Sequence, residues 1–293
     1  MLLALAALWG ASFMFIKVGV RELEPGTLIC FRLALGTLTL LPVALVTVGR
    51  RELWRSLRAS AGPLVLVGLL NSALPITVLA WAEKRVDSGL AAVIQASAPL
   101  FTALLALRFS RAEVVTGGRL AGLLVGFGGV GLLVGVQPSG DILSALAITF
   151  TAFCYAVAAL YSARALVHVP PLVTAVGALG SATLMLVPFA IVQPPDGVPG
   201  WKVTGSLLVL GILGTGVAYV LYYALLAGAG ASRSILITYL VPAIALVYGA
   251  VFLDEPVTRA AVAGLALVLG GVALGTGVLR VARRREQLPE AGG

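Results

Sequence analysis

Polar side chains and prolines recur at helical spacing inside two long apolar runs of the sequence. Intervals of four and three residues place side chains on one face of a helix. Amide and hydroxyl groups on such a face, among apolar neighbours, can bind a small organic solute through a few hydrogen bonds. The first run carries Asn71, Pro75 and Val78 at these intervals, and the second carries Gln95, Pro99 and Thr102.

Two prolines lie in the middle of apolar runs that otherwise read as single helices. Proline removes a backbone donor, so Pro99 and Pro242 free carbonyl groups near Gln95 and Thr238 and bend the chain. A freed carbonyl at membrane depth is tolerated where it faces protein or a water-filled cavity. A static kink is the ordinary interpretation of one proline. Because two stand at matching places, the sequence favours a pair of hinges.

Aromatic side chains accompany these polar positions. They offer apolar surface with a polar edge, which suits a solute that has both apolar and hydrogen-bonding parts. Trp81 lies near the end of a run, where an aromatic belt at the membrane surface is an equal explanation. Tyr222 and Tyr223 point different ways around a helix, so at most one faces the centre. The further residues predicted to contact solute are Trp9, Trp81, Tyr155, Tyr219, Tyr223, Thr238 and Tyr239.

Arg32 is the one basic residue that is not assigned to either side of the membrane, because it is predicted to lie about two turns into its apolar run. An ionisable residue inside a membrane indicates function by default, and this guanidinium could meet a substrate carboxylate. Its position would also let it extend to the outer surface, or pair with Glu22, Glu24 or Glu83. The structural role is favoured over the carboxylate contact, and both interpretations stay open.

The sequence lacks the residue sets that support catalysis or metal binding. It has one histidine, and its two cysteines lie in apolar runs, where buried thiols are expected. No Ser/His/Asp group, carboxylate pair or metal-ligand set falls within the runs, so neither an enzyme nor a cofactor is predicted. Every Asp and Glu is expected near the end of a run or in a loop. We therefore expect no buried carboxylate for proton coupling or for holding an organic cation, which favours neutral or zwitterionic solutes.

The elements that position these residues are predicted to be membrane-spanning helices. Of 293 residues, 60% are hydrophobic and 11% are charged, whereas soluble domains have about 25% charged residues. Crossing a hydrocarbon core takes about 20 apolar residues. The sequence thus predicts an all-α membrane protein with ten transmembrane helices, near residues 2–20, 26–48, 62–82, 88–108, 117–136, 142–163, 170–192, 204–227, 230–252 and 258–280.

The basic residues predict the orientation of these helices. Of the 20 Lys and Arg, 13 fall after even-numbered spans or in the C-terminal tail, six fall on the opposite side, and Arg32 lies within a span. Because positive residues collect on the cytoplasmic side, both termini are expected in the cytoplasm. The clusters RRELWRSLR and RVARRR are explained by this topology, so no nucleic-acid partner is predicted.

The second half of the chain repeats the first. With an offset of 146 residues Pro25 meets Pro171, and with an offset of 143 Pro99 meets Pro242. Small drifts at loops are typical of a diverged duplication. Each unit has five spans, an odd number, so the second unit would enter the membrane from the opposite face. The predicted domains are two inverted five-helix repeats at 1–137 and 138–281, followed by a basic cytoplasmic tail at 282–293.

Three segments resemble the EamA family of the drug/metabolite transporter superfamily: ALWGASFMFIKVG, CFRLALG and VYGAVFLDEPVT. The resemblance covers nearly the whole chain as two consecutive units. It implies a ten-helix transporter of the bacterial inner membrane, with a cavity formed by spans 1–4 and 6–9 and with spans 5 and 10 peripheral. Bacterial exporters of amino acids and related metabolites are the most similar members. The first unit departs from the pattern, with RFSRAE where the second has FLDEP.

Together these observations predict a secondary transporter, in particular an exporter, of small neutral or zwitterionic metabolites such as amino acids. Alternating access would come from an exchange of conformations between the two repeats. The alternatives are a multidrug, nucleoside or other metabolite permease of the same fold, and a channel or scramblase. The expected partners are the solute and the lipid bilayer. The chain is either a monomer or a homodimer through the glycine motifs of spans 5 and 10, Gly122-x-x-x-Gly126 and Gly271-x-x-x-Gly275.

Overall fold

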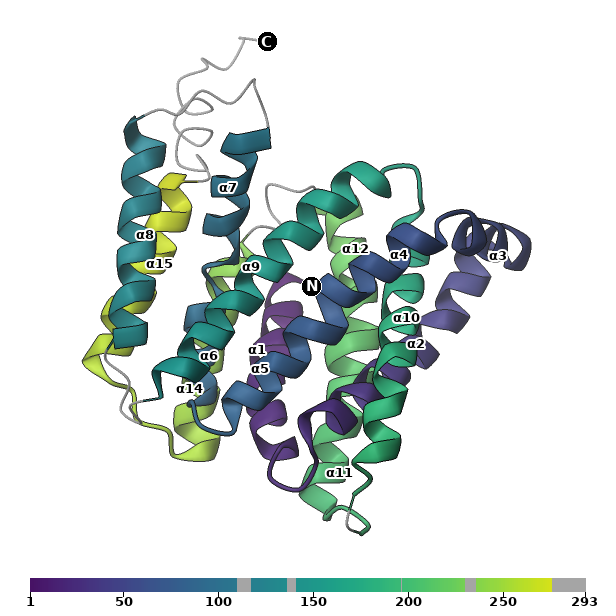
Figure 1. Ribbon diagram of the computed structural model, residues 1–293, viewed down its shortest axis with the longest axis horizontal. Coiled ribbons are helices and arrows are strands. Elements are labelled where there is room, and N and C mark those ends of the chain that lie inside the picture. The colour runs from purple at the N-terminus through teal and green to yellow at the C-terminus, as the bar shows by residue number, and fades with distance from the viewer. Residues whose placement is uncertain (110–116, 136–140, 196, 230–235, 276–293) are drawn as a thin grey trace, which may run out of the picture.

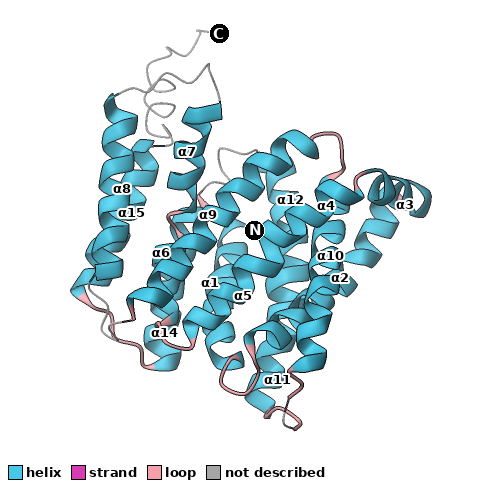
Figure 2. Ribbon diagram, viewed as in Figure 1, coloured by secondary structure: helices cyan, strands magenta, loops and turns pink. Residues whose placement is uncertain are grey.

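The computed structural model describes residues 1–109, 117–135, 141–195, 197–229 and 236–275. Within these ranges the chain is all helical and contains no strand (Figure 2). Eight helical stretches are long and apolar enough to cross a membrane, and two shorter apolar helices follow near the C-terminal end of the described chain. The predicted all-α membrane protein with ten helices is confirmed. The segment RFSRAE beyond Phe109, the start of the ninth predicted span and the basic tail lie outside the described residues.

The first half supplies five spans, two of which are interrupted (Figure 1). Pro25 is the first residue of its helix, where its missing backbone donor costs nothing. Gly49 ends the same helix with a φ of 87°, which a residue with a side chain rarely adopts. The spans are α1 (Leu2–Gly19), α2 (Pro25–Val48), α4–η1–α5 (Ala61–Gly68, Leu69–Ala73, Leu74–Glu83), α6–α7 (Ser88–Gln95, Ala98–Phe109) and α8 (Gly117–Gly135).

The second half supplies five more spans in the same order. Pro171 begins its helix as Pro25 does, and the span that corresponds to α4–η1–α5 again contains a π-helical segment. The spans are α9 (Ile142–Ala165), α10 (Pro171–Val192), α11–η2–α12 (Trp201–Leu208, Val209–Val217, Ala218–Ala229), α14 (Ile237–Leu253) and α15 (Arg259–Gly275).

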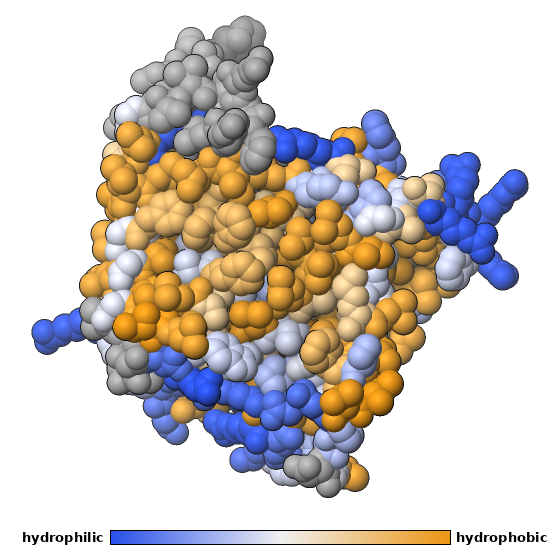
Figure 3. Space-filling view, in the orientation of Figure 1, coloured by the Kyte–Doolittle hydropathy of each residue, from blue (hydrophilic) through white to orange (hydrophobic). Residues whose placement is uncertain are grey.

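One helix was not predicted. The cluster RRELWRSLR, interpreted only as a basic anchor, forms the short helix α3 (Arg50–Ala59) between α2 and α4. It is strongly amphipathic: Leu53 is buried while the basic side chains project outward. Hydrophilic atoms gather around α3 and along the lower rim of the face shown in Figure 3, and apolar atoms cover the middle of that face. This distribution is expected for a protein with its middle in lipid and its ends in water.

The contacts between helices follow the order of the two halves. α1 packs on α14 while α9 packs on α6 and α7, and α2 packs on η2 while α10 packs on α4 and η1. α2 also packs on α10, and α8 on α15. Each contact therefore has its counterpart after the two halves are exchanged. This is the pairing expected from two related five-helix units, although the predicted domain boundaries themselves stay a prediction.

The glycine motifs of the fifth and tenth spans face each other within one chain. α8 and α15 lie side by side at the edge of the molecule (Figure 1). A Cβ atom at Gly271 would overlap the backbone of Gly126 and approach that of Gly122, and one at Gly122 would overlap the backbone of Gly275. The small residues thus allow two backbones to approach closely. A homodimer stays a prediction, and it would have to use other faces of these helices.

Candidate solute site at the two π-helical segments

The two π-helical segments occupy matching places in the repeat. An offset of 143 residues carries η1 (Leu69–Ala73) onto Ile212–Gly216, which lies within η2 (Val209–Val217). A π-helical turn adds a residue to the helix and turns the side chains that follow, and such turns occur frequently at functional sites. Since η1 carries Asn71 and η2 carries Thr215, both segments deliver polar groups to the interior.

Arg32 binds the second of these segments directly and lies near Tyr219, which is hydrogen-bonded to the first. Its side chain is 8% exposed, and Nε donates a hydrogen bond to Thr215 Oγ1 at 3.1 Å. The guanidinium also interacts electrostatically with Tyr155 and Tyr219, and the Tyr219 hydroxyl shares a hydrogen bond with Asn71. A buried cation from α2 of the first half therefore lies among polar groups of the second half, and Tyr219 connects this cluster to Asn71 of the first half.

The structural role and the carboxylate contact of Arg32 both stay predictions. The guanidinium is buried and does not extend to the surface, and among the described residues it forms no ion pair with Glu22, Glu24 or Glu83, although Glu83 lies near enough to interact with it electrostatically. Glu22 instead accepts a hydrogen bond from the Gly200 backbone N–H at 2.7 Å, and Glu24 pairs with Lys84 at 2.8 Å. Among the described residues, the terminal amino groups of Arg32 form no hydrogen bond.

The predicted aromatic residues of α1 and α12 form one group. The Trp9 ring lies 6.5 Å from the Tyr219 ring and 5.5 Å from the Tyr222 ring, measured between centroids. Tyr223 lies 6.0 Å from Tyr219 and 5.4 Å from Tyr222. Tyr222 and Tyr223 therefore both belong to the group, whereas the sequence placed at most one of them at the centre. Tyr219 links these rings to the polar cluster around Arg32.

The two predicted hinge prolines have different surroundings. The fourth span breaks at Ala96–Ser97, between α6 and α7, so Pro99 lies in the first turn of a new helix. Pro242 lies inside α14, which is continuous from Ile237 to Leu253. Before the break, the Gln95 side chain accepts a hydrogen bond from the Thr151 hydroxyl of α9. The helix is interrupted just before one proline and continuous through the other, and the hinge role of both stays a prediction.

Several predicted contact residues lie away from the polar cluster. The Thr102 hydroxyl donates to the Ala98 carbonyl of its own helix at 3.0 Å. Trp81 is half-buried near the end of α5, where the Arg85 guanidinium lies 5.2 Å from its ring centroid, in keeping with a position near the membrane surface. Pro75 and Val78 lie on α5, and Thr238 and Tyr239 lie in the first turn of α14. The roles of all these residues in binding stay predictions.

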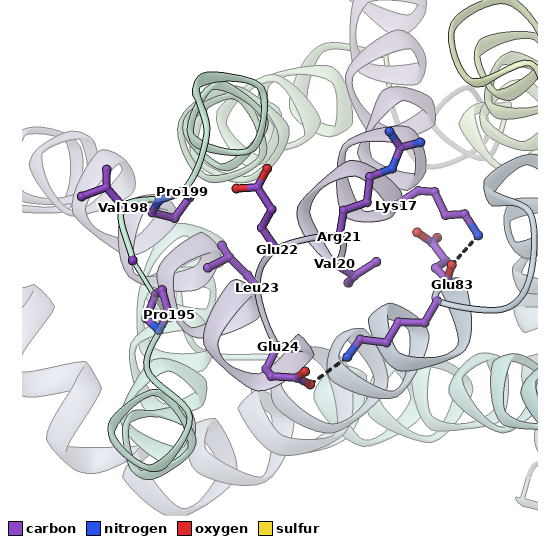
Figure 4. A pocket seen from close by; sticks show the side chains of 12 residues that line it. Lys17, Val20, Arg21, Glu22, Leu23, Glu24, Glu83, Pro195, Val198 and Pro199 are labelled. Carbon is purple, nitrogen blue, oxygen red and sulfur yellow. Dashed lines mark hydrogen bonds and ion pairs between the residues drawn. The ribbon is translucent and has the colours of Figure 1, made fainter.

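A separate pocket opens at the end of the bundle where α1, α2, α5 and α11 meet (Figure 4). Its volume is about 760 Å³, and acidic and basic residues line it. Lys17 and Glu83 lie together on one side, and Pro195, Val198 and Pro199 lie on the opposite side (Figure 4). None of the residues predicted to contact solute lines this pocket. The lining is Lys17, Val20, Arg21, Glu22, Leu23, Glu24, Glu83, Lys84, Pro195, Gly197, Val198 and Pro199.

Glu83 corrects the expectation that the chain has no buried carboxylate. It is the last residue of α5, and its exposed fraction is 0%. The sequence predicted a place near the end of a span, and Glu83 does lie there. It is nevertheless covered by α1 and by the turn before α6. Lys17 Nζ donates to the backbone carbonyls of Glu83 at 2.5 Å and Val86 at 2.8 Å, which ties α1 to the end of α5.

Carboxylates in the loops near Glu83 accept hydrogen bonds at the starts of helices. Glu255 follows the turn after α14 and accepts hydrogen bonds from Ser88 N and Ser88 Oγ at 2.8 Å and from Gly89 N at 3.1 Å. It thereby caps the start of α6. Asp141 caps α9 through Ser144, and the backbone N–H of Ser144 is the main reason that the pKa of Asp141 lies below its usual value. Burial, with repulsion from Glu255, raises the pKa of Asp87.

A model of the EamA-like transporter family matches residues 1–135 and again residues 142–276. The chain belongs to the EamA-like transporter family. Each match covers one of the two sets of five helices described above. This family member is therefore a multi-pass membrane transporter, and its relatives are named as transporters rather than as enzymes.

Relatives of this EamA-like transporter match along most of its length. An "Uncharacterized transporter" of Archaeoglobus fulgidus is 29% identical over 270 residues, which cover 90% of this chain and 93% of the relative. A "Probable terminal-alkyne amino-acid exporter" of Streptantibioticus cattleyicolor is 29% identical over 273 residues, covering 91% and 89%. The "Uncharacterized inner membrane transporter YedA" of Escherichia coli K12 is 29% identical over 219 residues, covering 73% and 67%.

A solved structure shares the fold of this EamA-like transporter. The structure, described as "Crystal structure of protein", superposes with a TM-score of 0.64 and covers 98% of this chain and 97% of its own. Its sequence identity of 20% supports similarity of fold and no more.

Sequence reasoning missed Thr215 of the polar cluster, and it also missed Ser72, a buried residue of η1. They are counterparts at the offset of 143 residues, since 72 and 215 differ by that number. Thr215 binds Arg32, whereas the counterpart of Arg32 is Ala178, and Ser72 Oγ is buried without a hydrogen-bonding partner among the described residues. The signal was present in the sequence, because a hydroxyl residue stands at this position in both halves, Ser72 next to Asn71 and Thr215 next to Gly214.

Proposed function

We propose that this transporter exports small zwitterionic metabolites such as amino acids from the cytoplasm across the bacterial inner membrane by alternating access. The observation that carries the proposal is the buried guanidinium of Arg32, held by Thr215 and lying among polar groups of the second repeat. The relative described as an amino-acid exporter supports this class of solute. The 13 basic residues on one side support cytoplasmic termini.

The geometry at Arg32 suits a carboxylate. Guanidinium groups bind carboxylates through two parallel N–H donors, and here Nε is already engaged by Thr215 while the terminal amino groups are unpaired among the described residues. The hydrogen bond to Thr215 orients the group, so that it is prepared for a ligand. A buried cation without a fixed anion is unfavourable, and a bound carboxylate would neutralise it.

The neighbouring rings suit the rest of such a solute. Trp9, Tyr219, Tyr222 and Tyr223 form a half-buried aromatic surface next to the polar cluster. An apolar side chain or an ammonium group can lie against aromatic faces. Because the cluster and the rings come from spans of both repeats, a relative motion of the repeats would open or close the site on one side at a time.

Counterflow in proteoliposomes tests this function. A carrier takes up labelled amino acid faster when unlabelled amino acid is loaded on the far side, whereas a channel or scramblase shows no such acceleration. A panel of amino acids, their amides, nucleosides and aromatic cations separates the proposed solutes from those of the alternative permeases. An absence of counterflow for every amino acid contradicts the proposal.

Replacing Arg32 tests the contact. Charge-assisted hydrogen bonds contribute about 1.5–3 kcal/mol each. The change Arg32→Gln is therefore expected to lower amino-acid exchange about tenfold to a hundredfold relative to exchange of amino-acid amides, which lack the carboxylate. Arg21→Gln is the matched control, since it removes the same charge from an exposed position. Equal loss for amino acids and amides shows instead that Arg32 supports folding.

A further inference from the structure

Glu83 lies in the wall of the pocket at the end of the bundle, and it is completely buried. Neither of its carboxylate oxygens has a hydrogen-bonding partner among the described residues. Burying an ionised carboxylate without donors is strongly unfavourable, whereas a neutral carboxylic acid costs far less. The arrangement therefore fits a side chain that carries a proton.

Among the described residues, no cation near Glu83 forms a hydrogen bond or ion pair with its carboxylate. Lys17 is the nearest cation, but its ammonium group donates to the backbone carbonyls of Glu83 and Val86 instead of to a carboxylate oxygen. The π-helical segment η1, which directly precedes α5, contributes no ionisable side chain. The ionisable groups that act on Glu83 are Lys17 of α1, Arg32 of α2 and Glu255 of the turn after α14. Asp87 before α6 interacts with Lys17 and Glu255, and Tyr155 of α9 lies by Arg32. Arg21, Glu22, Glu24 and Lys84 line the same pocket as Glu83.

Three charged residues of this region, Lys17, Arg32 and Glu83, lie in the first repeat. At the offsets that align the two halves, apolar or small residues replace these three. A feature confined to one repeat acts on one side of the membrane, since the repeats are expected to be inverted. The replacements are Ala163 for Lys17, Ala178 for Arg32 and Leu226 for Glu83.

We propose that Glu83 is a proton-binding site that controls opening of the outer side, an inference that rests on the transport function proposed above. With α1 held on α5 by Lys17, the carboxyl group keeps its proton. When the two helices separate, outer water enters through the pocket, the O–H bond breaks and the proton passes to water. The carboxylate left behind is hydrated and lies close to Lys17. A low pH outside therefore favours the conformation that is closed toward the outside, and it slows solute exchange on that side.

The size of the effect follows from the single proton involved. An equilibrium that releases one proton changes at most about tenfold per pH unit. Counterflow is therefore measured with the inner pH fixed and the outer pH varied. Wild-type exchange is expected to fall as the outer side is acidified. Glu83→Gln, which is neutral at every pH, is expected to lose this dependence. Glu24→Gln removes an exposed carboxylate of the same pocket and is expected to keep it.

The possible results are distinct. Wild-type counterflow that does not respond to outer pH, or a Glu83→Gln variant with the wild-type pH profile, overturns the inference while leaving the transport function intact. An absence of wild-type counterflow for any solute contradicts the transport function itself.

A second measurement needs neither a variant nor a known solute. Dicyclohexylcarbodiimide reacts with protonated carboxyl groups in apolar surroundings, and peptide mass spectrometry locates the product. In wild-type protein in liposomes, Glu83 is expected to be labelled at acid pH and progressively less as pH rises, while Glu24 stays unlabelled. Labelling of Glu83 that is absent, or that does not fall as pH rises, overturns the inference.

Discussion

Glu255 provides a test of how the turn after α14 holds the start of α6 in place. Its carboxylate accepts three hydrogen bonds, two from Ser88 and one from the backbone of Gly89. Ser88 is fully buried, so the change Glu255→Ala leaves its backbone N–H and its hydroxyl without an acceptor. The turn that presents Glu255 depends on Asp254, which has a φ of 56°, and on the contact of Glu255 N with the Gly249 carbonyl at 3.1 Å.

The expected magnitude follows from these groups. Each buried donor left unsatisfied costs about 1–3 kcal/mol, and loss of a negative charge at a helix N-terminus costs about 0.3–1 kcal/mol. Water entering from the nearby loop offsets part of this cost, so Glu255→Ala is expected to lower the free energy of unfolding by about 3 kcal/mol. Glu255→Gln keeps an acceptor oxygen and is expected to cost about 1 kcal/mol.

Equilibrium unfolding in mixed detergent micelles measures these differences. Glu22→Ala is the control, because Glu22 is exposed and accepts a single backbone hydrogen bond, from Gly200, and its removal should cost below about 1 kcal/mol. A double-mutant cycle with Ser88→Ala should show a coupling of about 1 kcal/mol or more. If the free energy of unfolding of Glu255→Ala lies within about 0.5 kcal/mol of the wild-type value, the capping role of Glu255 is refuted.

Further predictions concern helix packing, one turn and one cap. Gly271→Ala is expected to lower the free energy of unfolding by about 1–3 kcal/mol, because the added Cβ overlaps the backbone of α8. Gly270→Ala is the control and should be tolerated, because a Cβ there meets no atom within 4 Å. Equal free energies of unfolding for the two variants contradict this prediction. Asp254→Gly should raise the unfolding free energy by about 1 kcal/mol, because glycine relieves the left-handed conformation; a clear loss shows that the Asp254 side chain matters instead. Because the folded-state pKa of Asp141 is lowered, its stabilisation is complete above the ordinary carboxyl range and disappears as pH falls through the folded-state value. Asp141→Ala should therefore lower the melting temperature near neutral pH and converge with the wild type in acid, and a difference that persists in acid would show another role.

Much of what could be predicted from the sequence rests on the match between its two halves. Matching prolines located the helix starts at Pro25 and Pro171, because proline is favoured in the first turn of a helix. Residues such as Trp9 and Tyr219 could be placed in one aromatic group, because they lie on interior faces of their helices. Thr215 was missed, although its counterpart Ser72 stands beside a residue that was singled out.

Other features could not be read from spacing. The π-helical segments change which side chains share a face, so a pattern based on 3.6 residues per turn fails across them. The break before Pro99 and the continuous helix at Pro242 differ because neighbouring helices decide whether freed backbone groups are satisfied. Glu83 looked like a surface residue at the end of a span, and only its packing against α1 shows that it is buried.

The sequence by itself determined the membrane class, the ten helices and the duplication, because these follow from local hydropathy and from the order of residues along the chain. The tertiary structure alone decided which ionisable groups are buried and which partners they have. Burial depends on atoms brought from distant parts of the chain, as when Thr215 of one repeat meets Arg32 of the other. The free energy of a charge depends on those neighbours, so the places where chemistry can occur emerge only when the helices are packed.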